Sequence, residues 1–407
     1  MPQLSAGPDD PAAEPSAEPA AGPAVVPPGP VAIQVGCDAP NPAGRLLSQL
    51  QPLAPALVLL FGGCGKLLAS TGARLAAGLG PDCTVTGCSS AGEIGPEGYA
   101  ADSMIAIGFP SASFRASVLV LPDLASLPVS DWMAALRRHH AAFAADPGRS
   151  LFGLLLVDGM AGQEDALVAT IDAALPTVPV LGGSAADGLD FRRTVLLTGR
   201  RTHSDIALFI LVETDLDVSE VTFAHFSPTA TRAVVTAALP EKRRILELNA
   251  EPAADEYARL TGVNRAELTP TEFARHPLLL RMGQRHHVRA ISAVTEDRGL
   301  ALMSSIAAGT GLTLGRVEDM VLGFAEAMAA LPRPPLMVLG FDCILRRLAL
   351  ERAGLADTMS QMFTRYRVAG FSTYGEQHSG MHVNQTFVGI AFMPRPDRGT
   401  GDGTHAA

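Results

Sequence analysis

Apolar residues gather in short runs, separated by stretches with helical spacing and by turns rich in Gly and Ser. Runs of about four to eight apolar residues bounded by turn residues are typical of buried strands, whereas apolar residues three and four apart indicate helices. We expect helices from 65 to about 78, from a Ser130 or Asp131 cap to about 145, and over 164–175. The expected strands are 31–36, 56–61, 103–109, 114–121, 151–157, 206–212, 336–339 and 386–392.

A short motif recurs along this pattern. Val-x-Gly-x-Ser-x-x-Gly-Glu spans 85–93 and returns at 368–376, and its Val-x-Gly-x-Ser start returns at 180–184 without Gly-Glu. Each copy follows an apolar strand and a helix and precedes another strand, which indicates duplicated βαβ crossovers. We therefore expect an α/β fold of two intimately packed, related halves, with mixed sheets built from repeated strand–helix–strand units.

The segment 219–337 separates the second and third copies. Here we expect strands at 221–226, 233–238, 245–248, 288–294 and 300–305, and helices near 253–260 and 316–330. A boundary within 215–227 gives an N-terminal domain at 31–218 and a C-terminal domain at 219–394. Because no long flexible linker marks this boundary, the halves should pack closely, and a site between them is the default place for a ligand.

The two ends differ from the rest in composition. Residues 1–30 contain nine prolines, seven alanines, four acidic residues and no Lys or Arg. Such a segment buries too little apolar surface to offset its ordering entropy, so we expect disordered tails at 1–30 and 395–407. The first tail lacks the basic start and apolar stretch of a signal peptide, and the longest apolar runs are too short to span a bilayer.

Charge and cysteine content narrow the classes of function. The net charge of -10 and the pI near 5.5 argue against a nucleic-acid binder, which needs a basic face. The five cysteines have no zinc or iron–sulfur spacing. Their odd number, without a secretory leader, favours reduced thiols and a cytoplasmic protein that does not enter a membrane.

The repeated turns carry polar groups suited to gripping a small molecule. Glycine lets the backbone approach a ligand closely, and the Ser and Glu side chains supply donors and acceptors. In the first two copies the candidate ligand contacts are Ser89, Gly92, Glu93 and Ser184. The C-terminal copy is richer, with Asp342, Arg346, Ser372, Tyr374, Gly375, Glu376 and Asn384. The alternative interpretation is architectural, with Gly serving sheet curvature, Ser capping a turn and Glu exposed.

Four segments together resemble a known family. GCSSAGEI (87–94), FDCILRRLALE (341–351), VAGFSTYGEQ (368–377) and HVNQTFVGIAF (382–392) resemble the FIST sensory proteins, over roughly 31–393. The chain looks most like the nitric-oxide-sensing members. The resemblance implies a non-enzymatic sensor that binds haem b non-covalently and regulates a separate histidine kinase or a diguanylate cyclase or phosphodiesterase. An amino acid or similar metabolite remains open as the ligand, and so does a homodimer.

The residues permit a haem and do not demand one. No Cys-x-x-Cys-His occurs, so the haem would have no covalent link to the chain. The axial ligand would be His, Cys, Met or Tyr. His378 and His382, four residues apart beside the third turn, are the best candidates, followed by His286 and His287.

Two segments are similar to enzyme motifs but do not match them. Residues 61–66 lack the Gly-x4-Gly-Lys-Ser/Thr spacing of a phosphate loop, and 87–92 is not Gly-x-Ser-x-Gly. A hydrolase or transferase that uses the Gly/Ser turns remains the alternative of another class, and robust turnover of generic ester or nucleotide substrates would reveal it. A docking module without a ligand is a third class.

Overall fold

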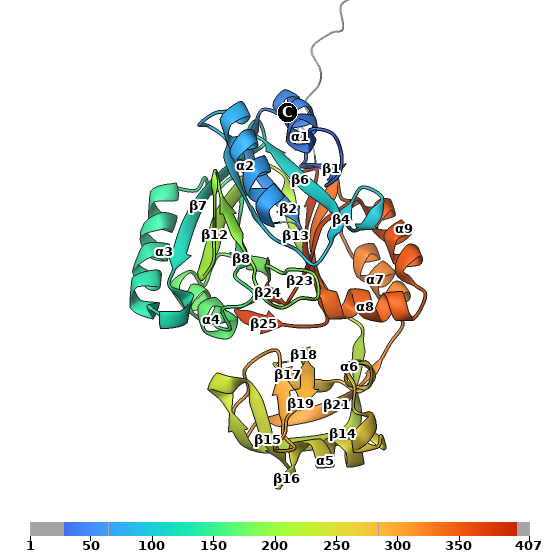
Figure 1. Cartoon of the computed structure of the whole chain (residues 1–407). Coiled ribbons are helices and arrows are strands. Elements are labelled where there is room, and N and C mark those ends of the chain that lie inside the picture. The colour runs from blue at the N-terminus through green and yellow to red at the C-terminus, as the bar shows by residue number, and fades with distance from the viewer. Residues whose placement is uncertain (1–27, 64, 284, 397–407) are drawn as a thin grey trace, which may run out of the picture.

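The computed structural model describes residues 28–63, 65–283 and 285–396. The expected disordered tails lie outside these residues, apart from 28–30 and 395–396. Within the described part the strands form four sheets, three of six strands and one of eight, and parallel and antiparallel pairs occur together (Figure 1). The expected α/β class with mixed sheets is therefore confirmed. In this part of the chain no helix is long and apolar enough to cross a bilayer.

Three units with nearly the same order of elements make up the upper body in Figure 1, and the third unit has one additional helix. The first unit comprises β1 (Val31–Gly36), α1 (Pro42–Leu50), β2 (Pro55–Gly62), α2 (Gly65–Leu79), β3 (Thr84–Cys88), β4 (Glu93–Gly95), β5 (Gly98–Ala100) and β6 (Ser103–Pro110). The second comprises β7 (Phe114–Pro122), α3 (Val129–Phe143), β8 (Ser150–Val157), α4 (Glu164–Ala174), β9 (Val180–Ser184), β10 (Leu196–Thr198), β11 (Arg201–His203) and β12 (Ile206–Thr214). The third comprises β13 (Asp217–Ala224), α7 (Met320–Ala329), β22 (Met337–Cys343), α8 (Ile344–Arg352), α9 (Ala356–Tyr366), β23 (Val368–Thr373), β24 (Glu376–His378), β25 (Met381–Val383) and β26 (Thr386–Met393).

The recurring motif marks the second strand of a parallel pair in every unit. β2 pairs with β3, β8 with β9 and β22 with β23, each through a helical crossover. A Cβ added to Gly87, Gly182 or Gly370 would lie 1.8 Å from a carbonyl oxygen of the neighbouring strand. No side chain fits at that distance, so the motif requires glycine there for close strand approach.

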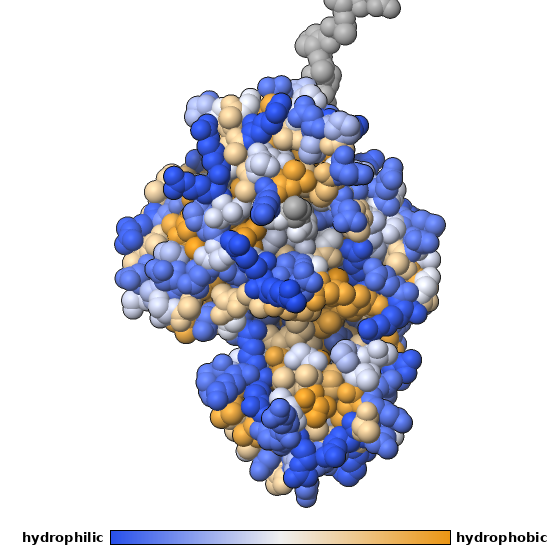
Figure 2. All heavy atoms as spheres, viewed as in Figure 1, coloured by the Kyte–Doolittle hydropathy of each residue, from blue (hydrophilic) through white to orange (hydrophobic). Residues whose placement is uncertain are grey.

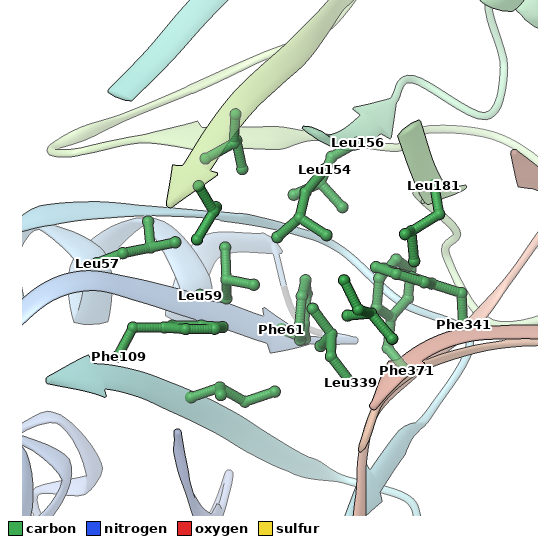
Figure 3. Packing of buried hydrophobic residues seen from close by; sticks show 14 of the residues in the cluster. Leu57, Leu59, Phe61, Phe109, Leu154, Leu156, Leu181, Leu339, Phe341 and Phe371 are labelled. Carbon is green, nitrogen blue, oxygen red and sulfur yellow. The ribbon is translucent and has the colours of Figure 1, made fainter. Parts of the chain in front are cut away.

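The hairpin after each motif joins the sheet of a different unit. β4–β5 pairs with β23, β10–β11 with β3, and β24–β25 with β9. The exchange of hairpins is cyclic, so each six-stranded sheet is completed by the hairpin of another unit. Apolar side chains of all three sheets meet in one core, among them Leu59, Leu154 and Phe341 (Figure 3). The three units therefore depend on one another for folding.

A separate β domain is inserted between β13 and α7, and it is the lower lobe in Figure 1. β18 and β19 are the outermost strands at opposite ends of the strand order, yet only Ala290 separates them along the chain. The sheet therefore curls around a core that contains Tyr257 and Phe273. Its elements are β14 (Phe226–Leu239), β15 (Arg244–Leu248), β16 (Glu251–Pro252), α5 (Ala253–Thr261), α6 (Pro270–Arg275), β17 (Leu278–Met282), β18 (Arg285–Arg289), β19 (Ile291–Val294), β20 (Leu300–Leu302) and β21 (Gly311–Val317).

Several expected elements differ from the structure. The helix expected to have a Ser130 or Asp131 cap begins at Val129, directly after Pro128. The strand expected at 300–305 ends at Leu302. The helix expected at 316–330 begins only at Met320, because Asp319 caps it by accepting two backbone N–H bonds while the residues before it pair in β21. The strand expected at 288–294 is two strands, which bend apart at Ala290. The strand expected at 336–339 continues as β22 to Cys343, and α8 begins directly after it at Ile344. For α7 and β22, pairing with strands distant in sequence decides the boundary.

Candidate functional site

A cavity of about 550 Å³ lies where the β domain meets the body. In Figure 2 hydrophobic residues gather around this waist of the molecule. The wall combines the loops after β8 and β9, the β domain, and α8 with the hairpin β24–β25. Apolar lining side chains include Met160, Leu189, Phe191, Ile291, Leu345 and Leu348, and polar ones include Glu164, Arg243, Arg352, Tyr374, His382 and Gln385. Apolar walls with a few convergent polar groups are typical of small-molecule sites.

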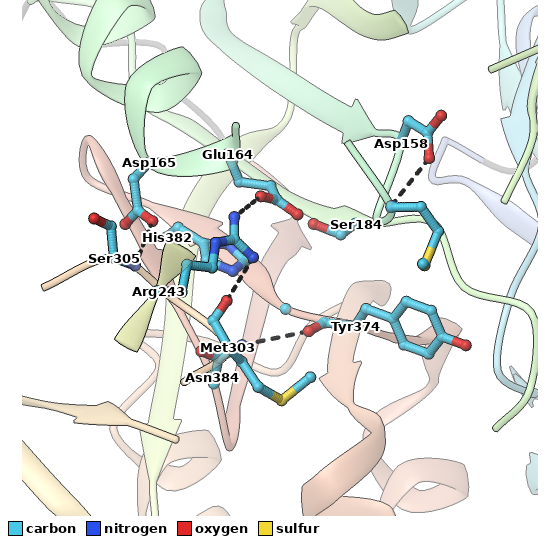
Figure 4. A network of polar contacts seen from close by, with 12 residues as sticks. Asp158, Glu164, Asp165, Ser184, Arg243, Met303, Ser305, Tyr374, His382 and Asn384 are labelled. Carbon is cyan, nitrogen blue, oxygen red and sulfur yellow. Dashed lines mark hydrogen bonds and ion pairs between the residues drawn. The ribbon is translucent and has the colours of Figure 1, made fainter. Parts of the chain in front are cut away.

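Charged side chains hold one corner of this cavity across the gap between β domain and body (Figure 4). Arg243 of the β domain forms an ion pair with Glu164, the first residue of α4, and donates to the Met303 carbonyl oxygen at 2.8 Å. Beside this pair, the Ser305 backbone N–H donates to the Asp165 carboxylate at 3.0 Å. Because Glu164 is only 2% exposed, losing its partner would leave a nearly buried charge.

His382 lies on the cavity wall and is buried. Its Nδ1 is 3.4 Å from the side-chain nitrogen of Gln377, which also donates to the Ser184 hydroxyl at 2.8 Å. Burial lowers the pKa of His382, and Arg243 and Arg289 add to this effect against the opposing pull of Glu164 and Asp165. The ring is therefore neutral at pH 7, the form in which imidazole binds metal ions.

The second expected haem ligand lies apart from the first. His378 contacts the Glu220 carboxylate at 2.7 Å and Thr222 at 3.2 Å. It borders a separate cavity of about 220 Å³ together with His286 and His287. Thus His382 and His378 do not converge on one site, and within the described residues no group of three or more His, Cys, Asp or Glu side chains is arranged to hold a metal ion.

The loop after β9 occupies the place of the missing Gly-Glu in the middle copy. Asp187 organises this loop, because its carboxylate accepts the backbone N–H groups of Phe191, Arg192 and Arg193 at 2.7–3.0 Å. The Tyr374 hydroxyl also donates to Asp187. The Phe191 ring stacks on Tyr374 with centroids 4.4 Å apart and an interplanar angle of 13°. An aromatic pair therefore borders the cavity on the loop side.

The two motif glutamates have equivalent surroundings. Each carboxylate accepts one hydrogen bond from the hydroxyl three positions before it and one from the hydroxyl ten positions after it. The donors are Ser90 at 2.6 Å and Ser103 at 2.9 Å to Glu93, and Thr373 and Thr386 to Glu376, the latter at 2.6 Å. Burial raises the pKa of both carboxyls, to about 8 for Glu376. Neither borders the 550 Å³ cavity, although Glu93 and Gly92 border a separate one of about 360 Å³.

Asp342 and Arg346 pair with each other inside the third unit, away from the 550 Å³ cavity. The ion pair is 3.1 Å long, and both side chains are fully buried. Tyr99 donates its hydroxyl to the same carboxylate, and the guanidinium lies 5.4 Å from the centre of the Phe223 ring. Burial raises the pKa of Asp342, against the opposing charge of Arg346. The contact of this pair with a ligand remains a prediction.

The remaining predicted residues lie at the places where the hairpin of one unit pairs with a strand of another. Asn384 donates to the Tyr374 carbonyl at 3.3 Å, and a Cβ on Gly375 would lie 2.2 Å from His382, so these residues and Ser184 gather beside the cavity. The other two serines hold exchanged hairpins at other junctions. Ser89 binds the backbone of Val195 in both directions, and Ser372 exchanges backbone hydrogen bonds with Gly92 and Ala91.

Sequence reasoning missed several residues that line the cavity. Arg243 and Glu164 come from segments far apart in the sequence, and no local pattern links them. Phe191 had one available signal, because the middle copy replaces Gly-Glu with a longer polar loop. An insertion at a repeated turn is a candidate functional loop.

Comparison with protein-family models finds two matches along the chain. The model of the FIST N domain matches residues 56–251, and that of the FIST C domain matches residues 253–379. Among curated proteins, none matches the chain. FIST domains are sensor domains of signal transduction. With both of its domains matched in order along most of the chain, this protein belongs to the FIST family.

Proposed function

We propose that this protein senses a small ligand bound in the 550 Å³ cavity between the β domain and the body, and that a separate signalling protein reads the bound state. The observation that carries the proposal is the position of the cavity, whose wall needs residues from both parts. A ligand that contacts both parts stabilises one relative placement of them, which shifts the population towards that state.

A narrow neck supports such a movement. The chain enters the β domain at Phe226 and leaves it at Val317, and these two residues pair as neighbours in one ladder. Just outside, the Glu318 N–H donates to the His225 carbonyl at 2.8 Å. Two adjacent chain crossings allow bending with little loss of packing, as in hinge closure around ligands. The Arg243–Glu164 pair then acts as a contact that ligand binding can strengthen or replace.

Haem is the ligand that we propose first. The wall residues fit it in three respects: an apolar lining, a neutral imidazole at His382, and Arg352 available for a carboxylate group. His382 would hold the iron, and Arg352 would hold a propionate. A bound haem would supply an iron that takes up a diatomic gas such as nitric oxide.

A visible spectrum tests this ligand. Protein from haem-supplemented cells should show a Soret band that shifts on addition of nitric oxide. His382→Ala should lose the band, while the matched His378→Ala variant should keep it, because His378 faces a different cavity. No Soret band after reconstitution would refute the haem proposal.

An amino acid is the second candidate, because Arg243 and Glu164 present opposite charges side by side at the cavity, as a zwitterion requires. A thermal-shift screen with the amino acids tests it, since a ligand that binds only the folded state raises the melting temperature. No rise with any amino acid, or an equal rise in Arg243→Ala, would refute this candidate.

We further propose that the output passes to a separate histidine kinase or cyclic-di-GMP enzyme. Co-purification with such a protein, in a ligand-dependent amount, would support this link. Retention of the same proteins by ligand-free and ligand-bound forms in equal amounts would contradict it.

A further inference from the structure

One residue at the cavity mouth is held in a strained backbone conformation. Phe191 has φ 52°, in the left-handed region that residues with a side chain rarely adopt. The Asp187 carboxylate and the Tyr374 hydroxyl hold it there by accepting its backbone N–H at 3.0 and 3.3 Å. Strain that persists under several restraints is characteristic of functional positions. A loop that only closed a turn would have no need of Phe here.

The side chain of Phe191 is exposed and borders the cavity. Phe191 is 41% exposed, whereas the Tyr374 ring beneath it is only 4% exposed. Met160 and Leu189, which also line the cavity, are 44% and 56% exposed. Large apolar side chains left open to solvent around one cavity mark a binding surface. The hydrophobic patch at the waist in Figure 2 lies in this region.

A positively charged side chain borders the same cavity. Arg352, the last residue of α8, lines it and has no ion-pair partner in the part of the chain that the structure describes. Arg243, in contrast, is already paired with Glu164. A ligand with one anionic group would therefore find its partner in Arg352 without breaking the contact between β domain and body.

We infer that the Phe191–Tyr374 stack is a platform for a planar aromatic ring, and that Arg352 binds an anionic group on the same ligand. The inference rests on the proposed ligand site and specifies the ligand as a planar aromatic carboxylate or a similar anion. The stack offers a flat face of fixed orientation, and an offset aromatic ring gains more there than a saturated ring of equal area.

Two matched probes test the platform by calorimetry on the full chain: 2-naphthoate and its saturated analogue, decahydro-2-naphthoate. The wild-type protein should bind the aromatic acid roughly 2- to 12-fold more tightly, which is the range of a single stacking contact. Phe191→Leu keeps an apolar side chain and should make the two affinities equal. Leu322→Ala, a change at an exposed apolar residue away from the cavity, should leave both affinities unchanged.

Two more variants locate the site and the anion contact. Ser292→Trp, which fills the cavity from the β domain, should abolish binding of both acids. Arg352→Gln should weaken the binding of both acids by the same factor. Circular dichroism establishes that each variant is folded.

The outcomes separate the platform from the proposed sensor site. Equal binding of both acids to the wild type, blocked by Ser292→Trp, would overturn the platform and retain the cavity as a ligand site. No binding of either acid would also overturn the platform, whereas the sensor site stands or falls with the spectrum and the thermal-shift screen. An aromatic preference that survives Phe191→Leu would likewise overturn it.

Discussion

Glu376 gives the sharpest prediction about stability, because its carboxyl is fully enclosed at the junction of two exchanged units. Burial raises its pKa from 4.5 to about 8, even though the Thr373 and Thr386 hydroxyls favour the charged form. At 1.36 kcal/mol for each factor of ten in proton affinity, the difference corresponds to about 5 kcal/mol. The folded state therefore binds this proton more tightly than the unfolded state does.

The sign of the pH dependence follows from that difference. The stabilising contribution is fully present below pH 4.5 and is lost as the pH rises through about 8, where the buried carboxyl must ionise. Glu376→Gln keeps the shape and cannot ionise. Relative to this variant, the wild-type free energy of unfolding should fall by about 1.4 kcal/mol per pH unit between pH 5 and pH 8.

Urea unfolding of both proteins from pH 5 to pH 9 measures this difference, since all other groups titrate alike in the two. The control is Glu318→Gln, because the Ser227 hydroxyl lowers the pKa of that exposed carboxyl and no loss of stability with rising pH is expected there. A difference between wild type and Glu376→Gln that stays constant with pH would refute the reasoning.

Two further predictions concern packing and the contact between the two parts. Gly370→Ala should destabilise the fold by more than about 3 kcal/mol in chemical denaturation, because its Cβ would lie 1.8 Å from the Gly340 oxygen. Gly311→Ala, where nothing lies within 4 Å, is the tolerated control, and equal losses would contradict this account. Arg243→Ala should cost about 3 kcal/mol by leaving Glu164 buried and unpaired, and adding Glu164→Gln should restore most of the loss. Failure of that second change to rescue stability in the same assay would show that the charge is not the cause.

Much of the body could be predicted from the sequence. The three Val-x-Gly-x-Ser copies mark the three parallel strand pairs, since each glycine meets a neighbouring carbonyl at a distance that excludes a Cβ. The apolar runs at 151–157 and 206–212 are buried strands of one sheet. The β domain was harder to predict, because most of its strands are short and partly exposed, and 288–294 contains a bend that periodicity does not reveal.

The candidate site could be predicted only in part. Tyr374, Gly375, Asn384 and His382 are close in sequence and gather beside the cavity. Asp342 and Arg346 have the same polar character, yet they pair with each other inside the third unit. A sequence reports that a residue is charged, but the face towards which it points depends on the strand and helix that carry it.

The sequence by itself determined the local chemistry of each unit: where strands run, where a Cβ is excluded, and which turn carries a glutamate. Only the tertiary structure decided which unit receives each hairpin, and that the loop at 187–193 meets the β domain and the third turn around one cavity. The physical reason is that these pairings join backbone groups more than a hundred residues apart, and any exposed strand edge offers the same donors and acceptors. The choice among edges is made by packing of the whole core, which no local segment encodes.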